Sequence, residues 1–330
     1  ELRALKKHLI LAVKILVSLA LLAYIFAQLD WTALTAKAGT IAWWGLPLAT
    51  ATLLAALYSG TIRWTILLRT HHPEYRINTL FRPYLIAALF NNVMPSSTGG
   101  DLIRSYYIYR YSRDAVSAIS PVISERVIGL VILIALNVMA IYFTDSIGIV
   151  HAGVWSTLLI VLGVSLAALT LIAIPATYWP LHRLLEKLSR FRIVQVLLRI
   201  GESTHGYLTR PGVVLAQVVF SLAGQFLAIM VYQVLALALD IDISFEALLV
   251  VVPLALIMAS LPISIGGMGV RELTAVALFT RFGISETDAA AVALFFIPVV
   301  ILASLPGLYF YLTSTDSKEL MQGASSGKLG

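Results

Sequence analysis

The sequence predicts an all-α integral membrane protein with about six transmembrane helices and two re-entrant helical hairpins, arranged as two inverted-topology repeats. Three observations predict this fold. The 330-residue chain is 59% apolar and only 12% charged, whereas soluble domains carry roughly 25% charged residues. Long apolar stretches recur along it, and one short motif occurs twice. This composition excludes an ordinary cytosolic enzyme, a disordered regulator and a fibrous protein.

Six apolar stretches are long enough to cross about 30 Å of hydrocarbon as helices. They cover residues 9–27, 43–68, 127–143, 154–178, 213–239 and 289–312. No small-residue cleavage site follows the first stretch, so we interpret it as an anchor and not as a signal peptide. The ten-residue alternation of a transmembrane β-barrel is absent from the sequence.

Two further apolar regions, 80–111 and 247–282, are interrupted by Pro/Gly-rich breaks at 95–101 and 262–269. Proline removes a backbone donor and glycine permits non-helical dihedral angles, so a helix is expected to stop at each break. Half-length helices around a break predict a re-entrant hairpin that turns back near the middle of the membrane. The alternative is two short full crossings in each region.

Charge predicts the orientation of these elements. Basic residues gather before the first stretch, on both sides of the first hairpin and between the fourth and fifth stretches, whereas the opposite loops are mainly acidic. The positive-inside rule then places both termini in the cytoplasm of a multi-pass cell-membrane protein, with the two hairpins entering from opposite faces. In residues 181–208, apolar residues recur at helical spacing with basic residues between them. This pattern favours an amphipathic helix on the inner leaflet over a binding site for a cytoplasmic partner.

The two breaks share the pattern P-x-S-x-G-G-x-x-x-R. It is formed by Pro95, Ser97, Gly99, Gly100 and Arg104, and again by Pro262, Ser264, Gly266, Gly267 and Arg271. Residues 1–150 form the first predicted repeat and residues 151–322 the second. Each repeat consists of two spans, a hairpin and a third span, and the two repeats start from opposite sides of the membrane. Residues 323–330 are expected to be a flexible tail. Inverted repeats of this kind are typical of secondary transporters, which bind substrate at the midplane between broken helices.

Arg104 and Arg271 are expected in the first turn of the helix that follows each break, where the helix dipole is positive. An arginine inside the membrane is a functional candidate by default, and a guanidinium binds phosphate in bidentate fashion. Asp101 is expected to cap its helix. The alternative is structural ion pairing, of Asp101 with Arg104 or Arg126 and of Glu272 with Arg271.

Further candidate substrate-binding residues are polar side chains close to the breaks in sequence. They are Asp101, Asn91, Asn92, Ser97, Ser264, Glu125, Arg126 and Glu272. For the asparagines and serines the alternative is hydrogen bonding to unwound backbone at the break, which is the favoured role for the serines. Glu125 and Arg126 are adjacent, so they point about 100° apart on a helix and one of them is expected to face the hairpin. Glu125 is also the candidate proton carrier. Arg63 is expected to extend to the inner membrane surface.

Several motifs of chemistry are missing from the sequence. It has no cysteine, no G-x-x-x-x-G-K-[ST] nucleotide loop, no H-E-x-x-H and no G-x-S-x-G elbow. We therefore expect that the protein binds no metal or other cofactor. We also expect that it is not an enzyme and that ATP does not drive its transport.

Three stretches, 92–104, 124–130 and 262–272, together resemble the flippase-like integral membrane family that includes the membrane domain of lysylphosphatidylglycerol synthase. The resemblance covers about residues 5–315 and is to a stand-alone member. It implies translocation of a lipid with a modified headgroup between leaflets. The soluble aminoacyl-transferase half of that synthase has no counterpart in this sequence.

Repeat, motif and resemblance together predict a flippase for an anionic, phosphate-containing lipid, with aminoacylated and polyprenyl-linked lipids among the candidates. The expected partners are a membrane lipid with an anionic headgroup and a lipid-modifying enzyme, without nucleic acid; the oligomeric state is open. One alternative is a membrane-embedded enzyme or accessory subunit of lipid glycosylation, using Asp101, Glu125 and Glu272 as carboxylates. The other is a small-solute secondary transporter.

Overall fold

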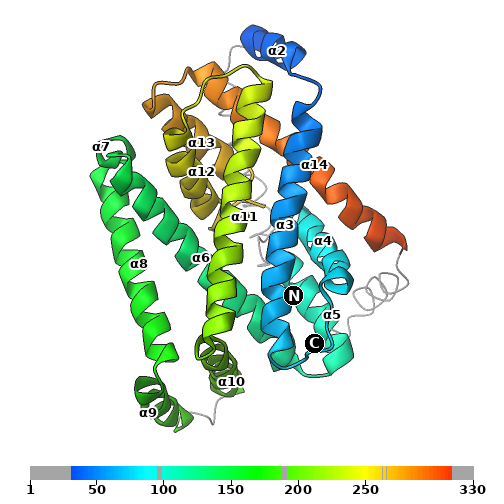
Figure 1. Cartoon of the computed structure of the whole chain (residues 1–330), viewed down its shortest axis with the longest axis vertical. Coiled ribbons are helices and arrows are strands. Elements are labelled where there is room, and N and C mark those ends of the chain that lie inside the picture. The colour runs from blue at the N-terminus through cyan, green and yellow to red at the C-terminus, as the bar shows by residue number, and fades with distance from the viewer. Residues whose placement is uncertain (1–30, 95–98, 188–191, 262, 265, 314–330) are drawn as a thin grey trace, which may run out of the picture.

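The computed structural model of the chain describes residues 31–94, 99–187, 192–261, 263–264 and 266–313. All regular structure in these residues is helical, without a strand (Figure 1). The expected all-α class is therefore confirmed. The expected span at 9–27, Ser97 and the tail at 323–330 lie outside the described residues.

Five described helices are long and apolar enough to cross a membrane. They are α3 (Gly45–Arg69), α6 (Ala115–Phe143), α8 (Ala152–Ala173), α11 (Pro211–Ala238) and α14 (Glu286–Thr313). Each matches an expected stretch, so the protein is a multi-pass membrane protein.

Two of these helices have boundaries that differ from the expected ones. Helix α6 begins at Ala115 instead of 127, because the Asp114 side chain accepts hydrogen bonds from the Val116 and Ser117 N–H groups and caps the helix. Helix α8 ends at Ala173 instead of 178, because Pro175 starts a new helix and forces the preceding Ile174 out of the helical region.

The two interrupted regions each form a pair of short helices. The first pair is α4 (Ile77–Val93) with α5 (Gly99–Ser112), and the second is α12 (Phe245–Ser260) with α13 (Val270–Arg281). Between α12 and α13, Gly266, Gly267 and Gly269 have φ of 57°, 77° and 83°, which only glycine adopts without strain. In Figure 1 the pairs lie toward opposite ends of the molecule. Their entry from opposite membrane faces stays a prediction.

Shorter helices lie near the two ends of the molecule. Helices α2 (Trp31–Thr40) and α7 (Ile147–Val150) lie at one end, and α9 (Pro175–Glu186) and α10 (Arg192–Leu208) lie at the other (Figure 1). The expected amphipathic segment 181–208 thus divides between two helices, where one was expected. Its docking on the inner leaflet stays a prediction.

The interior is built by helices from both halves of the chain. Helices α3 and α11 run side by side (Figure 1), and the Ser59 hydroxyl donates to the Phe220 carbonyl across them at 2.7 Å. The first turns of α14, residues 289–293, are fully buried, and α14 packs against α4, α13, α3 and α11. Helix α8 contrasts with these, because only its Leu158 is buried; an apolar helix exposed on most sides suits contact with lipid.

Two glycines bring α4 into backbone contact with both of its neighbours. A Cβ on Gly100 of α5 would overlap the Ala87 carbonyl, and a Cβ on Gly307 of α14 would overlap the Leu85 carbonyl. Helix α4 is therefore held closely between α5 and α14. This packing fixes the position of α5, which carries two of the charged candidate residues.

Candidate functional site

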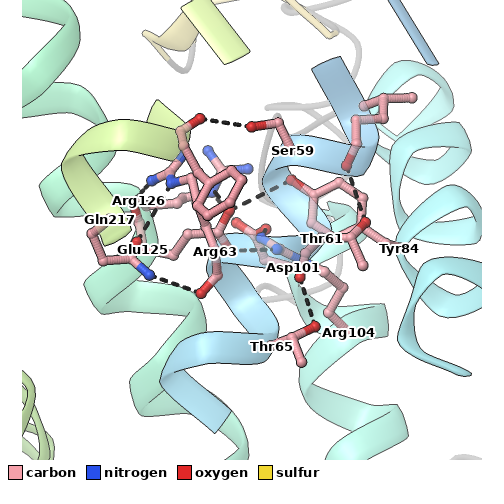
Figure 2. Close-up of polar contacts among 12 residues, drawn as sticks. Ser59, Thr61, Arg63, Thr65, Tyr84, Asp101, Arg104, Glu125, Arg126 and Gln217 are labelled. Carbon is pink, nitrogen blue, oxygen red and sulfur yellow. Dashed lines mark hydrogen bonds and ion pairs between the residues drawn. The ribbon is translucent and has the colours of Figure 1, made fainter. Parts of the chain in front are cut away.

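The charged residues predicted around the first break come together inside the helix bundle (Figure 2). Arg104 of α5 is buried, and its two terminal nitrogens bind different carboxylates. Nη1 donates to Glu125 Oε2 at 2.6 Å, and Nη2 donates to Asp101 Oδ1 at 2.6 Å. The structural ion pair that the sequence left open as an alternative is thus present at Arg104.

Aromatic rings complete the surroundings of Arg104. The centre of its guanidinium lies 5.4 Å from the centroid of the Trp64 ring and 4.8 Å from that of Tyr84. Both separations are within the range of cation–π attraction. Two carboxylates and two rings therefore fix this side chain, which leaves it little freedom to follow a moving ligand.

Asp101 does not cap α5, contrary to expectation. The helix already begins at Gly99, and the Gly100 N–H donates to the Asn91 side chain at 2.8 Å, so Asn91 supplies the hydrogen bond at the helix start. The Asp101 carboxylate instead contacts Arg104 through Oδ1 and the Nε of Arg126 through Oδ2. The cap was mispredicted because the two glycines let the helix start before the aspartate.

Glu125 and Arg126 of α6 both face the first helix pair, where only one was expected to. Glu125 contacts Arg104 and Arg126 contacts Asp101. The two residues diverge by about 100° on α6, but Asp101 and Arg104 lie one turn apart on α5. Asp101 therefore reaches Arg126, and Arg104 reaches Glu125. The result is an alternating chain of four charges between two helices.

Arg63 of α3 is a third arginine at this site and does not extend to the membrane surface as expected. Its side chain is only 12% exposed. Nη2 donates to the Glu125 backbone carbonyl at 2.7 Å, and Nε donates to Gln217 Oε1 at 3.4 Å. Gln217 in the apolar helix α11 was the signal that could have located it, because a buried amide in such a helix needs a polar partner.

A cavity of about 410 Å³ is bounded by α3, α4, α5, α6, α11 and the end of α12. Five charged residues line it: Arg63, Asp101, Arg104, Glu125 and Arg126. Three arginines against two carboxylates leave one positive charge formally unbalanced. The most exposed of the five charged side chains is Arg126, at 38%. The cavity thus combines a net positive charge with walls made by membrane helices.

The second break carries a smaller ion pair. Arg271 donates from Nε to Glu272 Oε1 at 2.9 Å and also contacts this oxygen through Nη2. The other oxygen of Glu272 accepts from the Gly269 N–H at 2.7 Å, which caps α13. The Arg271 guanidinium lies 4.3 Å from the centroid of the Phe296 ring. The alternative of structural pairing is therefore present here as well.

Arg104 and Arg271 line different cavities. Arg271 borders a mostly apolar cavity of about 290 Å³ between α4 and α14, together with Asn92, whose amide donates to Ser304 at 3.0 Å. Asn91 borders the first cavity instead. The structure therefore does not bring the two predicted phosphate-binding arginines to one place.

Ser264 lies at the second break and is buried. Its hydroxyl has no hydrogen-bond partner among the residues that the structure describes. Within the same residues, no His, Asp or Glu side chains gather in a group that could hold a metal ion.

Comparison with known proteins finds a family that matches most of the chain. Residues 11–307 match the family described as the lysylphosphatidylglycerol synthase TM region. The chain is also 26% identical over 295 residues to a UPF0104 membrane protein of Methanothermobacter thermautotrophicus, a match that covers 82% of this chain and 85% of the relative. The resemblance expected from the three sequence stretches is confirmed.

Proposed function

We propose that this chain, which belongs to the lysylphosphatidylglycerol synthase TM region family, translocates an anionic, phosphate-containing lipid between the leaflets of the cell membrane. The observation that carries the proposal is the cavity with three arginines and two carboxylates. An unbalanced charge among membrane helices is costly, and an anionic group in the cavity would balance it.

Arg126 is the residue that meets the lipid headgroup first in this proposal. It lines the cavity, and more than a third of its side chain is accessible. A lipid phosphate would compete with Asp101 for its guanidinium, because both are anions that accept charge-assisted hydrogen bonds. The acyl chains would stay in the surrounding hydrocarbon while the headgroup crosses through the protein.

Transport is proposed to need no ATP, because the sequence contains no nucleotide loop. Uphill movement would then draw on an ion gradient or on the membrane potential, which is worth about 2.3 kcal/mol per charge and 100 mV. Under this proposal the protein is a transporter and not an enzyme. The proposed protein partner is a lipid-modifying enzyme that supplies the lipid substrate.

The proposal is tested with purified protein in liposomes, by following the leaflet accessibility of headgroup-labelled phosphatidylglycerol, its aminoacyl ester and a polyprenyl phosphate. At least one of these lipids should exchange between leaflets without ATP, and Arg126→Ala should slow that exchange. Arg281→Ala is the matched control, because Arg281 contacts the Ile149 carbonyl outside this cavity. Three immobile lipids combined with uptake of a water-soluble solute would favour a small-solute transporter, and chemical turnover of a lipid would favour an enzyme.

The proposed orientation, with both termini in the cytoplasm, has its own test. The chain has no cysteine, so single cysteines can be introduced and labelled from either side. Cysteines at Tyr75 and Ser112, which flank the first helix pair, should label only from inside. Cysteines at Ser244 and Thr287, which flank the second pair, should label only from outside. Labelling of one pair from both sides would remove that hairpin and the inverted repeat with it.

A further inference from the structure

We infer that Arg63 carries the unbalanced positive charge of the cavity and that Arg63 and Arg126 together form its phosphate-binding pair, with Arg104 as a positioning residue. This inference rests on the proposed function and names the residues through which it would act. It differs from the sequence-based expectation, in which Arg104 and Arg271 hold the phosphate and Arg63 lies at the membrane surface.

The first argument is that Arg63 lacks a hydrogen-bonded carboxylate. Arg104 binds two carboxylates, and Arg126 contacts the Asp101 carboxylate. The nearest carboxylate oxygen to Arg63 among the described residues is Glu125 Oε1, at 3.9 Å from Nη1, beyond hydrogen-bond distance. That carboxylate is already bound to Arg104 through its other oxygen at 2.6 Å. Among the three arginines, Arg63 is therefore the one whose charge has no hydrogen-bonded counter-ion in the described residues.

The second argument is that Arg63 keeps donors in reserve. A guanidinium has five N–H groups. Arg63 uses Nε toward Gln217 and Nη2 toward the Glu125 carbonyl, and no hydrogen bond from its Nη1 is found among the described residues. Arg63 also lines the cavity. It can therefore bind an anionic oxygen without giving up its present contacts.

The third argument is that neighbouring helices hold Arg63 in a fixed orientation. Gln217 of α11 accepts from Arg63 Nε and returns a hydrogen bond to the Arg63 carbonyl at 2.8 Å. Gly129 of α6 leaves the space that the guanidinium fills, since a Cβ there would lie 2.6 Å from Nη2. A side chain held in this way loses little entropy when it binds a ligand, which is the condition for an effective binding residue.

Arg104 has a different task in this arrangement. It binds Asp101 and Glu125 at once and lies within cation–π distance of the Trp64 and Tyr84 rings. By binding Glu125 through Oε2 it keeps that carboxylate from hydrogen bonding to Arg63, and it shares Asp101 with Arg126. The ligand is then a phosphate group whose oxygens are shared by Arg63 from α3 and Arg126 from α6. Such a group is part of a lipid headgroup, although free phosphate has the same recognition chemistry.

The test measures binding to the purified full-length chain in detergent, with dioctanoyl phosphatidylglycerol and inorganic phosphate as probes. Arg63→Met should weaken lipid binding on the order of tenfold to a hundredfold, the usual worth of a charge-assisted hydrogen bond. Gly129→Ala should weaken it in the same direction without changing any charge, because the added methyl displaces the guanidinium. Gly163→Ala in α8 is the matched control, since its Cβ would meet nothing within 4 Å.

A second readout separates binding from structure. Lipid that binds the folded state raises the melting temperature with its concentration. This rise should be present in wild type and in Gly163→Ala and strongly reduced in Arg63→Met and Gly129→Ala. If Arg63→Met does not fold, Gly129→Ala decides, and wild-type binding by that variant would overturn the inference.

The remaining outcomes separate the inference from the proposed function. Lipid binding that depends on Arg63 without any leaflet exchange would support the phosphate-binding pair and refute the transporter. Exchange at the wild-type rate in Arg63→Met would overturn the role of Arg63 and leave the transporter standing. Equal binding of inorganic phosphate would overturn the assignment to a lipid headgroup, and binding of neither probe by wild type would overturn the pair.

Discussion

Arg104→Met is expected to destabilise the protein before it affects transport. The substitution keeps the length and apolar volume of the side chain but removes both hydrogen bonds to carboxylates. Asp101 keeps its contact with Arg126, so the larger loss falls on Glu125. The remaining polar contacts of its carboxylate are the Tyr84 hydroxyl at 3.5 Å and Arg63 at 3.9 Å.

The magnitude follows from the burial of these groups. Removing one partner of a buried ion pair costs about 3–5 kcal/mol, because the other charge is left uncompensated. The contacts that Asp101 and Glu125 retain place the expected cost at the lower end, about 3 kcal/mol. At roughly 2–4 °C per kcal/mol, the melting temperature should fall on the order of 10 °C.

The assay is thermal unfolding of the purified protein in detergent, followed by tryptophan fluorescence. The double variant Arg104→Met/Glu125→Gln should recover most of the loss, because it no longer leaves a buried charge without a partner. Arg281→Met, at an exposed position, is the control for loss of an arginine as such. A melting temperature of Arg104→Met within about 2 °C of wild type, equivalent to less than about 1 kcal/mol, would refute this reasoning. It would favour the sequence-based expectation that Arg104 binds the substrate phosphate.

Three further substitutions test the packing and the polar contacts. Gly100→Ala should cost about 1–3 kcal/mol because its methyl overlaps the Ala87 carbonyl, whereas Gly163→Ala should be neutral or slightly stabilising; equal melting temperatures would contradict the close approach of α4 and α5. Asp114→Ala should cost about 1 kcal/mol near neutral pH through loss of the α6 cap. The Ser117 hydroxyl and the backbone N–H groups hold the pKa of Asp114 below its usual value, so this difference should persist above about pH 4 and disappear as the pH falls through the lowered pKa in denaturation experiments. Asn137→Leu should cost about 0.6–1.7 kcal/mol in the same experiments, because the buried amide donates to the Val250 carbonyl at 2.8 Å; a more stable variant would show that this bond does not hold α6 to α12.

The sequence by itself determined which stretches form membrane-crossing helices and where the two Pro/Gly breaks lie. Apolar stretches of sufficient length predict membrane-crossing helices in any context, because backbone groups in hydrocarbon must bond within their own segment. Proline and glycine act on neighbouring residues only, so the breaks before α5 and α13 could be located without knowledge of the fold. The boundary errors at α6 and α8 arose where a single capping aspartate and a single proline outweighed the hydropathy pattern.

Only the tertiary structure decided which charges meet. Sequence patterns could not decide whether Arg104 binds substrate or forms an ion pair. They also could not decide whether Arg63 lies at the membrane surface or in the bundle interior. These outcomes depend on α3, α5, α6 and α11 packing together, which brings Arg63 to Gln217, 154 residues away along the chain. Local rules act over one or two helical turns, whereas the partner of a buried charge is set by whichever helix lies opposite, and the cost of leaving that charge unpaired then fixes the contact.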